Sequence, residues 1–158
     1  MKVLSFDPGY DRLGVAVIEV NLDRQQELLF SDCFITDREL SAEERLFDLG
    51  KRVVKVVKDF QPELIALEKL FFNQNVTTAL RVAEVRGVII FLAKQADCQV
   101  VEYSPQEIKV ATTGYGRSDK KAVYLMVKKL LKNVPEKALD DEYDAVAIGI
   151  TALAHYRD

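Results

Sequence analysis

Four acidic side chains in this sequence stand where their neighbours would bury them. Asp7 ends one apolar run and Glu68 ends another, while Asp141 and Asp144 lie one turn apart in a predicted C-terminal helix. A carboxylate taken out of water needs a paired charge or a metal ion to offset its desolvation cost. A hard cation such as Mg2+ meets that need, so the sequence indicates a divalent-metal site.

Predicted strands place the first two of these acids. Residues 2–7 form a short apolar run closed by Pro8 and Gly9, and residues 63–68 form a second run that ends at Glu68. Ligands of open α/β sheets gather at strand ends, so Asp7 and Glu68 meet if the two strands are neighbours. The i, i+3 spacing of Asp141 and Asp144 puts that pair on one helical face.

Such a cluster of carboxylates has a defined chemistry. The four groups repel one another unless cations hold them, and two metals about 3.5–4 Å apart permit in-line attack of water on a phosphodiester. Each acid also has a simpler interpretation. Asp7 before Pro8 and Gly9 can open a turn, Glu68 can pair with a surface lysine, and Asp140 or Asp141 can cap the last helix. Asp140 is also an i, i+4 neighbour of Asp144, so spacing alone does not choose between Asp140 and Asp141.

The remaining elements follow from hydrophobic periodicity and turn residues. Three strands with short polar connections predict an antiparallel meander, and alternating helices and strands follow it. Ser41 and Glu44 form a capping box that starts the first helix, which continues to Phe60. We expect an α/β fold with a mixed five-stranded sheet, three antiparallel strands and then parallel strands, flanked by helices, in a single domain over residues 1–158. The expected strands cover 2–7, 13–20, 28–35, 63–68 and 99–103, and the later helices cover 75–95, 105–111, 118–131 and 138–156.

Composition is that of an ordinary globular chain. The 158 residues are 49% hydrophobic and 30% charged, with a formal net charge of −3. Cys33 and Cys98 stand in apolar runs and cannot form a multi-bridge framework, which fits a reducing cytoplasm. No segment approaches the roughly 18 apolar residues of a membrane span, so we expect a soluble cytoplasmic protein without a membrane partner.

Charge is segregated near the C-terminus in spite of the acidic average. Residues 117–132 hold six basic side chains against one acid, and residues 136–144 hold five acids against Lys137 alone. Bases beside acids suit a metal-dependent enzyme that acts on phosphates, although two solvated helix faces would give the same pattern. A second pattern lies in the 75–95 helix, where Ala79, Ala83 and Gly87 fall four apart. Small residues on one stripe permit close approach of another helix, within the chain or in a dimer.

Four blocks of sequence together resemble the RuvC-type Holliday junction resolvases. They are Asp7-Pro8-Gly9 with Gly14, Ala66-Leu67-Glu68 with Phe71 and Asn75, Arg86-Gly87, and Asp141 and Asp144 with Ala145, Ala147 and Ile148. The similarity runs from about residue 2 to residue 154. It implies a ribonuclease-H-like fold and a homodimer that resolves four-way DNA junctions by paired nicks in recombination and repair, with a branch-migration motor complex as a further partner.

The resemblance also assigns roles. It implies that Asp7 is shared between two Mg2+ ions, with Mn2+ as a substitute, and that Glu68, Asp141 and Asp144 complete the site. It thereby favours Asp141 over Asp140, and the expected products carry a 5′-phosphate and a 3′-hydroxyl. No histidine is needed as a base, and we expect the sole histidine, His155, at the surface.

Five residues are expected to contact DNA. Phe71 matches a family aromatic that stacks on a base at the junction, where stacking contributes about 1–3 kcal/mol, although it could instead cover the core. Lys109 and Lys120 match basic positions on the family's DNA-binding face, where each would neutralise a backbone phosphate. Composition alone adds Arg117 and Lys121.

Two other function classes share some of these features. Actin-like and sugar-kinase-like phosphotransferases have a hairpin sheet and an Asp-x-Gly turn, but that turn usually carries Ser or Thr, whereas here it continues into Tyr10 and Asp11. A junction-binding module without catalysis would have lost one of the four acids, and all four are present. We therefore expect a junction-cleaving endonuclease.

Overall fold

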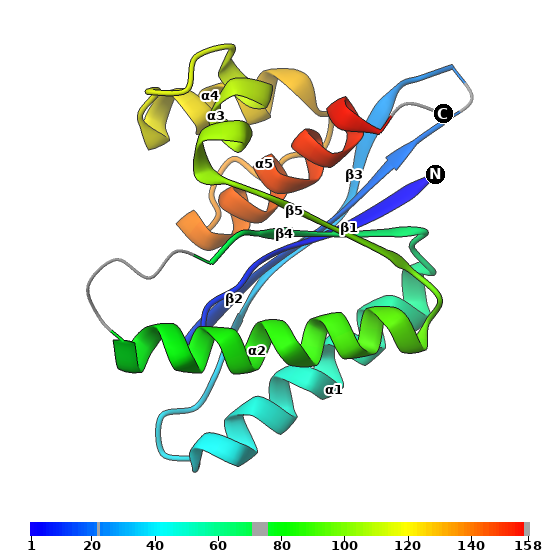
Figure 1. Ribbon diagram of the computed structural model, residues 1–158. Coiled ribbons are helices and arrows are strands. Elements are labelled where there is room, and N and C mark those ends of the chain that lie inside the picture. The colour runs from blue at the N-terminus through cyan, green and yellow to red at the C-terminus, as the bar shows by residue number, and fades with distance from the viewer. Residues whose placement is uncertain (22, 71–75, 157–158) are drawn as a thin grey trace.

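A five-stranded mixed sheet runs through the computed structural model, which describes residues 1–21, 23–70 and 76–156 (Figure 1). Its strands are β1 (Lys2–Asp7), β2 (Arg12–Val20), β3 (Gln26–Ile35), β4 (Leu64–Glu68) and β5 (Gln99–Tyr103). Their order is β3-β2-β1-β4-β5. The first three strands pair antiparallel, and β1–β4 and β4–β5 pair in parallel. The predicted mixed sheet is therefore confirmed. β1 and β4 are neighbours, which is the condition under which Asp7 and Glu68 meet.

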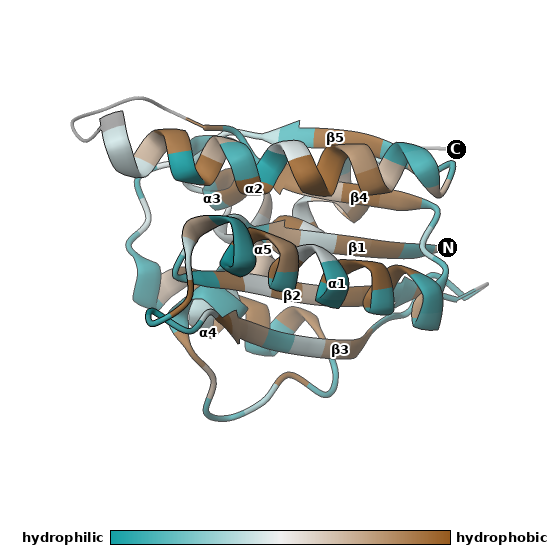
Figure 2. Ribbon diagram, turned by 90° about the horizontal axis from the view of Figure 1, so that it is seen from below, coloured by the Kyte–Doolittle hydropathy of each residue, from teal (hydrophilic) through white to brown (hydrophobic). Residues whose placement is uncertain are grey.

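Helices cover both faces of the sheet. α1 (Ala42–Phe60) and α2 (Val76–Gln95) lie side by side on one face, as Figures 1 and 2 both show. α3 (Pro105–Thr113), α4 (Lys120–Leu130) and α5 (Asp140–His155) lie on the other, with α5 against the central strands. Within the described residues, no helix is both long and apolar enough to cross a membrane.

Local capping explains where several helices begin. Ser41 and Glu44 form the predicted capping box, and a second box at Ser104 and Glu107 starts α3. Each box satisfies N–H groups that the first turn leaves without partners. α5 starts differently, because its N-cap is Leu139 and makes no side-chain cap hydrogen bond. The alternative in which Asp140 or Asp141 caps this helix is therefore wrong.

The other differences from the predicted boundaries have local causes. β2 begins one residue earlier and β3 two residues earlier than expected, since these strands pair along their full length. α4 begins at Lys120 rather than at residue 118, because the Asp119 side chain accepts a hydrogen bond of 2.8 Å from the Ala122 amide. α3 extends to Thr113 and ends at Gly114, whose φ of 77° is a left-handed conformation that glycine adopts without strain. The expected first residue of α2, Asn75, lies outside the described residues.

Alternation along the strands decides which way the site acids face. In β1, Leu4 and Phe6 belong to the core beneath α1 and α2, whereas Val3 belongs to the core beneath α5. Successive side chains of a strand point to opposite faces, so Asp7 points to the α5 side. In β4, Leu64 and Ala66 likewise belong to the α5 core, which puts Glu68 on that same side.

Glycines let α5 approach the sheet closely. A Cβ on Gly149 would lie 2.7 Å from Ile18 Cδ1 and 2.8 Å from Ser5 Oγ, and one on Gly14 would overlap the backbone oxygen of Asp141. The buried Ser5 hydroxyl donates a hydrogen bond of 2.7 Å to the carbonyl oxygen of Ala145. The N-terminal half of α5 is thus held against β1 and β2.

We expect Gly14→Ala to destabilise the fold, because the added methyl group meets backbone rather than a movable side chain. Overpacking of this kind costs about 1–3 kcal/mol, which thermal unfolding would show as a lower Tm. Gly50→Ala is the control, since a Cβ at Gly50 within α1 meets only Val88 Cγ1 at 3.4 Å. It should leave Tm unchanged or raise it, as a helix-interior Gly→Ala change contributes about 0.5–1 kcal/mol. Equal Tm values for the two variants would contradict the close approach of α5 to β2.

Candidate active site

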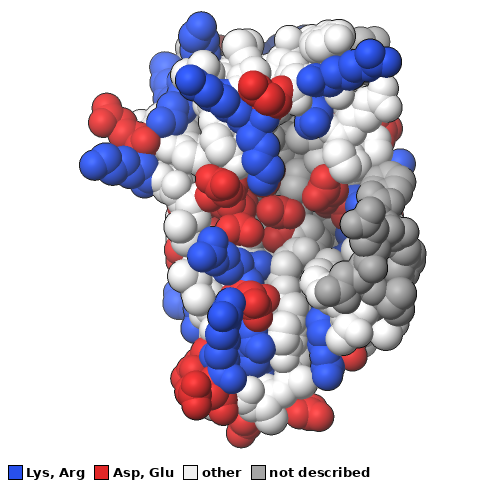
Figure 3. All heavy atoms as spheres, turned by 90° about the vertical axis from the view of Figure 1, so that its left-hand side faces the viewer, with Lys and Arg blue, Asp and Glu red and all other residues white. Residues whose placement is uncertain are grey.

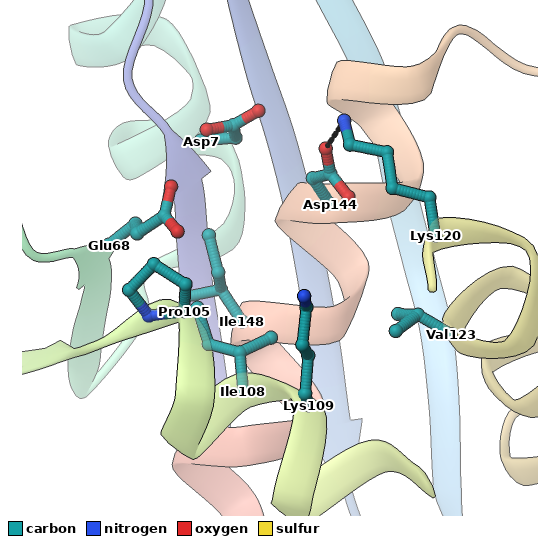
Figure 4. Close-up of a pocket in the computed structure, with 9 residues that line it drawn as sticks. All are labelled: Asp7, Glu68, Pro105, Ile108, Lys109, Lys120, Val123, Asp144 and Ile148. Atoms are coloured by element: carbon teal, nitrogen blue, oxygen red, sulfur yellow. Dashed lines mark hydrogen bonds and ion pairs between the residues drawn. The ribbon is translucent and has the colours of Figure 1, made fainter. Parts of the chain in front are cut away.

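Two of the predicted site acids end neighbouring strands. Phe6 of β1 pairs in register with Leu67 of β4, so the next residues, Asp7 and Glu68, lie side by side at the carboxyl edge of the sheet. The N-terminal part of α5 brings Asp144 to the same place, and in Figure 4 the carboxylates of all three residues surround one space. Residues more than 130 positions apart in the chain thereby share one site.

These three acids line a pocket of about 370 Å³. Its opposite wall is formed by α3 and by α4, which contribute apolar side chains and two lysines. The remaining lining residues are Pro105, Ile108, Lys109, Lys120, Val123 and Ile148. A pocket with acids on one side and bases on the other is suited to a ligand that carries both a cation and an anion.

Asp7 has the most strongly raised pKa among the acids of the pocket. Burial, and then the charges of Asp144, Glu68 and Asp141, raise the pKa of Asp7 from its ordinary value of 3.8 to about 7. The pKa values of Glu68 and Asp144 are also raised, in each case mainly by burial. The folded chain therefore holds more negative charge here than its own bases neutralise, and a bound cation would relieve that excess.

Two basic side chains partly offset these charges. Lys120 Nζ donates a hydrogen bond of 2.8 Å to Asp144 Oδ2, which raises the pKa of Lys120 and opposes the effect of burial on Asp144. Lys109 also lines the pocket, and its charge lowers the pKa of Glu68. The two lysines thus place positive charge in the pocket that holds the acids.

Asp141 faces a different direction from the other three acids. It lies 3.6 Å from the Arg12 guanidinium and 4.0 Å from Cys33 Sγ, and it lines a second groove rather than the pocket. Its charge still reaches Asp7, whose pKa it raises. Asp140 is exposed and lines neither cavity, which agrees with its place as a neighbour of the site.

A buried arginine that had no predicted role holds the end of β4. The side chain of Arg86, on α2, is 10% exposed, and it donates hydrogen bonds to the backbone oxygen of Glu68 and to the carboxylate of Glu102. Breaking a buried, paired charge is costly, so this contact fixes the backbone that carries Glu68. The sequence does contain a signal, since Arg86 falls beside the buried face formed by Val85 and Ile89.

The donor set fits a hard divalent cation. All four side chains are carboxylates, which are the ligands that Mg2+ uses in proteins. As they stand, no three His, Cys, Asp or Glu side chains of the described residues converge closely enough to hold a metal ion. Two of the four acids pair with bases instead, Asp144 with Lys120 and Asp141 with Arg12. The fit therefore rests on donor chemistry and on the excess negative charge around Asp7.

Not all of the predicted DNA-contacting residues line the pocket. Lys109 and Lys120 line the pocket, and Lys121 lines a shallow neighbouring surface with Tyr124 and Leu125. Arg117 is exposed in the α3–α4 loop and lines neither place. Phe71 lies outside the described residues. His155 is exposed at the end of α5, with its ring 5.1 Å from that of Tyr103.

Comparison with known proteins gives one consistent answer. A family model described as "Crossover junction endodeoxyribonuclease RuvC" matches residues 3–152. The RuvC proteins of Thermotoga petrophila and Thermosipho melanesiensis are each 40% identical over 148 residues, which is 94% of this chain and 89% and 94% of theirs. The structure of T. thermophilus RuvC in complex with a Holliday junction substrate superposes with a TM-score of 0.89 at 32% identity, over 96% of this chain and 92% of that one.

A more distant structure shares only the architecture. A yeast mitochondrial Holliday junction resolvase superposes with a TM-score of 0.70 at 14% identity, over 96% of this chain and 77% of that one. The family model spans residues 3–152, which include the positions of all four acids, and the bacterial relatives match 94% of the chain. This chain belongs to the RuvC family of crossover junction endodeoxyribonucleases.

Proposed function

We propose that this family member resolves Holliday junctions by paired symmetric nicks and that Asp7, Glu68, Asp141 and Asp144 hold two Mg2+ ions for that reaction. The observation that carries the proposal is the position of Asp7, where burial and three neighbouring carboxylates raise the pKa to about 7. A fold does not retain such a repulsive cluster for stability, because apolar residues would serve better. Asp7 is the proposed central ligand, because it lies beside Glu68 at the strand ends, opposite Asp144 across the same pocket, and because all three other acids act on its charge.

The bound cations would supply a water of lowered pKa as nucleophile and a positive charge beside the phosphate, and Mn2+ would substitute for Mg2+. The protein's own residues orient the rest. Lys120 is paired with Asp144 and lines the pocket together with Lys109. With a cation on Asp144, the Lys120 ammonium would be available to donate to a phosphate oxygen. The positive charges of the two lysines offset the negative charge on the phosphate under attack. The products carry a 5′-phosphate and a 3′-hydroxyl.

The surface around the site supports four-way junction DNA as the substrate. Figure 3 shows acids gathered in the middle of this face, with basic side chains on both sides of them. Lys121 extends the basic surface beyond the pocket, and Arg117 is exposed in the adjacent loop. We retain Phe71 as the residue that stacks on a base, since the sequence alone supports that role. The cytoplasm is the proposed location, and the free thiols of Cys33 and Cys98 are compatible with it.

Paired nicks on a two-fold junction call for two copies of the site, and α2 offers the surface for a homodimer. A Cβ built on Gly87 would have no atom within 4 Å, so no described part of the chain covers the small-residue stripe at this position. On the same helix Leu80 is 56% and Phe91 66% exposed. An apolar, uncovered helix face is the kind of surface that a second copy buries.

We expect Asp7→Asn to abolish Mg2+-dependent cleavage of a synthetic four-way junction while sparing binding. The loss should exceed about a hundredfold, because even residues that only support a metal ligand affect activity by about 10–100-fold. Cleavage on a denaturing gel and binding by fluorescence anisotropy would separate the two effects. Asp140→Asn, an exposed acid next to the site, is the control and should cleave at nearly the wild-type rate. Retained nicking by the Asp7 variant would refute the site assignment.

The raised pKa of Asp7 predicts a pH-dependent stability in metal-free protein. The folded state holds the proton up to pH about 7, whereas the unfolded chain releases it near the ordinary value of 3.8. Between those values the folded state binds more protons, so stability falls as pH rises. Asp7→Asn removes this penalty, so in EDTA its Tm advantage over the wild type should grow from pH 4 to pH 7 and then level off. A constant difference across that range would contradict the assignment, and Mg2+ at pH 8 should raise the Tm of the wild type far more than that of the variant.

Replacing an apolar side chain on the exposed face of α2 should separate the dimer. Leu80→Glu places a charge in the proposed interface, so sedimentation velocity at micromolar concentration should show monomer where the wild type is dimeric. Leu125→Glu is a matched control, since Leu125 is 54% exposed compared with 56% for Leu80 but lies on α4. A wild-type monomer, or equal dissociation of both variants, would count against α2 as the interface.

A further inference from the structure

A second groove lies on the other side of the acidic centre from the lysine-lined pocket. It has a volume of about 470 Å³ and is shared by the β1–β2 turn, the loop after β3 and the first turns of α2. Asp141 lines it, whereas Asp7, Glu68 and Asp144 line the pocket. The proposed metal site therefore forms the boundary between two cavities.

Three arginines from three different segments line this groove. Arg12 begins β2, Arg38 lies in the loop between β3 and α1, and Arg81 lies on α2. Their side chains are 53%, 78% and 44% exposed. Each has an acidic neighbour, with Arg12 at 3.6 Å from Asp141, Arg38 at 3.1 Å from Asp11 and Arg81 at 2.9 Å from Glu84. Ion pairs as exposed as these contribute little and exchange readily for another anion.

A fourth, buried arginine adds to the positive charge at this groove, because it shares the acidic partner of Arg38. Arg45 is 10% exposed, contacts the Asp11 carboxylate and donates a hydrogen bond of 2.9 Å to Thr36 Oγ1. Arg45 donates to one oxygen of the Asp11 carboxylate and Arg38 to the other, and both lower the pKa of Asp11. Two guanidinium charges therefore face one carboxylate, which leaves a net positive charge at this turn.

Arg45 also contacts the aromatic side chain that lines the groove. The Arg45 guanidinium lies 4.0 Å from the centroid of the Tyr10 ring, and the Arg81 guanidinium lies 5.7 Å from it. Cation–π contacts of this kind hold the aromatic ring and orient the exposed arginine. A cation bound to Asp141 would compete with Arg12 for that carboxylate, so the Arg12 guanidinium would be available to another anion. The groove thus presents three guanidinium groups beside the acidic centre, and a ring contact orients that of Arg81.

We propose that this arginine groove, formed by Arg12, Arg38 and Arg81, binds phosphates of the cleaved DNA strand on the side of the scissile phosphate opposite Lys109 and Lys120. The inference rests on the proposed function, since it uses the same acidic centre as the point where the strand crosses. Guanidinium groups donate to phosphate oxygens in a bidentate geometry, which makes them better suited than lysine to hold a strand in register. Figure 3 shows the corresponding arrangement, with basic side chains on both sides of the acids.

The salt dependence of junction binding tests the proposal without any cleavage. For the double variant Arg38→Gln/Arg81→Gln in EDTA, the slope of log affinity against log salt should fall by about 1.8, since each phosphate contact contributes about 0.9. Raising the salt from about 50 to 200 mM should then weaken the variant about tenfold less than the wild type. The matched control is Lys55→Gln/Arg52→Gln on α1, whose side chains are 76% and 42% exposed, pair with acids and do not line the groove.

An unchanged slope in the groove variant, or an equal fall in the control, would overturn the proposal. If the glutamine variant has a lowered Tm, the charge-preserving Arg38→Lys/Arg81→Lys variant replaces it. It should keep the wild-type slope yet bind more weakly, because lysine loses the bidentate contact. Wild-type affinity for the lysine variant, with a normal slope, would refute the guanidinium role.

Phosphate ethylation interference then decides the side on which the groove acts. The wild type should be sensitive on both sides of the cleaved bond, the groove variant on one side only, and Lys120→Gln on the other. Loss on the same side for both variants would overturn the assignment. These binding readouts remain valid if the wild type fails to cleave in Mg2+, a result that would instead refute the proposed function.

Discussion

Because β1 pairs in parallel with β4, the carboxylates of Asp7 and Glu68 are forced to the same edge and the same face of the sheet. Alternation along both strands then turns the two side chains toward α5 rather than toward α1 and α2. The strand pairing thus fixes where the backbone of each acid lies. The rest of the site is arranged around this constraint.

Close packing of α5 converts that edge into an enclosed acidic centre. Gly14 and Gly149 leave no room for a Cβ between helix and sheet, and Ser5 ties the N-terminal half of α5 to β1. Asp144 is consequently held close enough to raise the pKa of Asp7, while Lys120 on α4 offsets part of the charge. A divalent cation bound here would offset both the burial of these carboxylates and their mutual repulsion, and both follow from the close packing of α5.

Buried arginines support the site from both sides. Arg86 holds the backbone of Glu68 and pairs with Glu102, and Arg45 holds the turn that follows Asp7 through Asp11 and Thr36. A desolvated guanidinium is stable only where several acceptors surround it, so each of these contacts specifies one conformation of its segment. The two arginines thereby extend the rigidity of the core to the two strand ends that carry site acids.

Local sequence determined the strands, the capping boxes and the candidate acids, because periodicity, caps and turns act over only a few residues. Four separated motifs were also sufficient to indicate the family and, through it, the choice of Asp141 over Asp140. Only the tertiary structure decided that Asp141 faces Arg12 while Asp144 faces Lys120, since that depends on how far α5 turns against β2. The same holds for the groove shared by Arg12, Arg38 and Arg81, which exists only because three distant segments pack together. Pairing and packing over long sequence separations bring these charges together, and no local pattern encodes their distances.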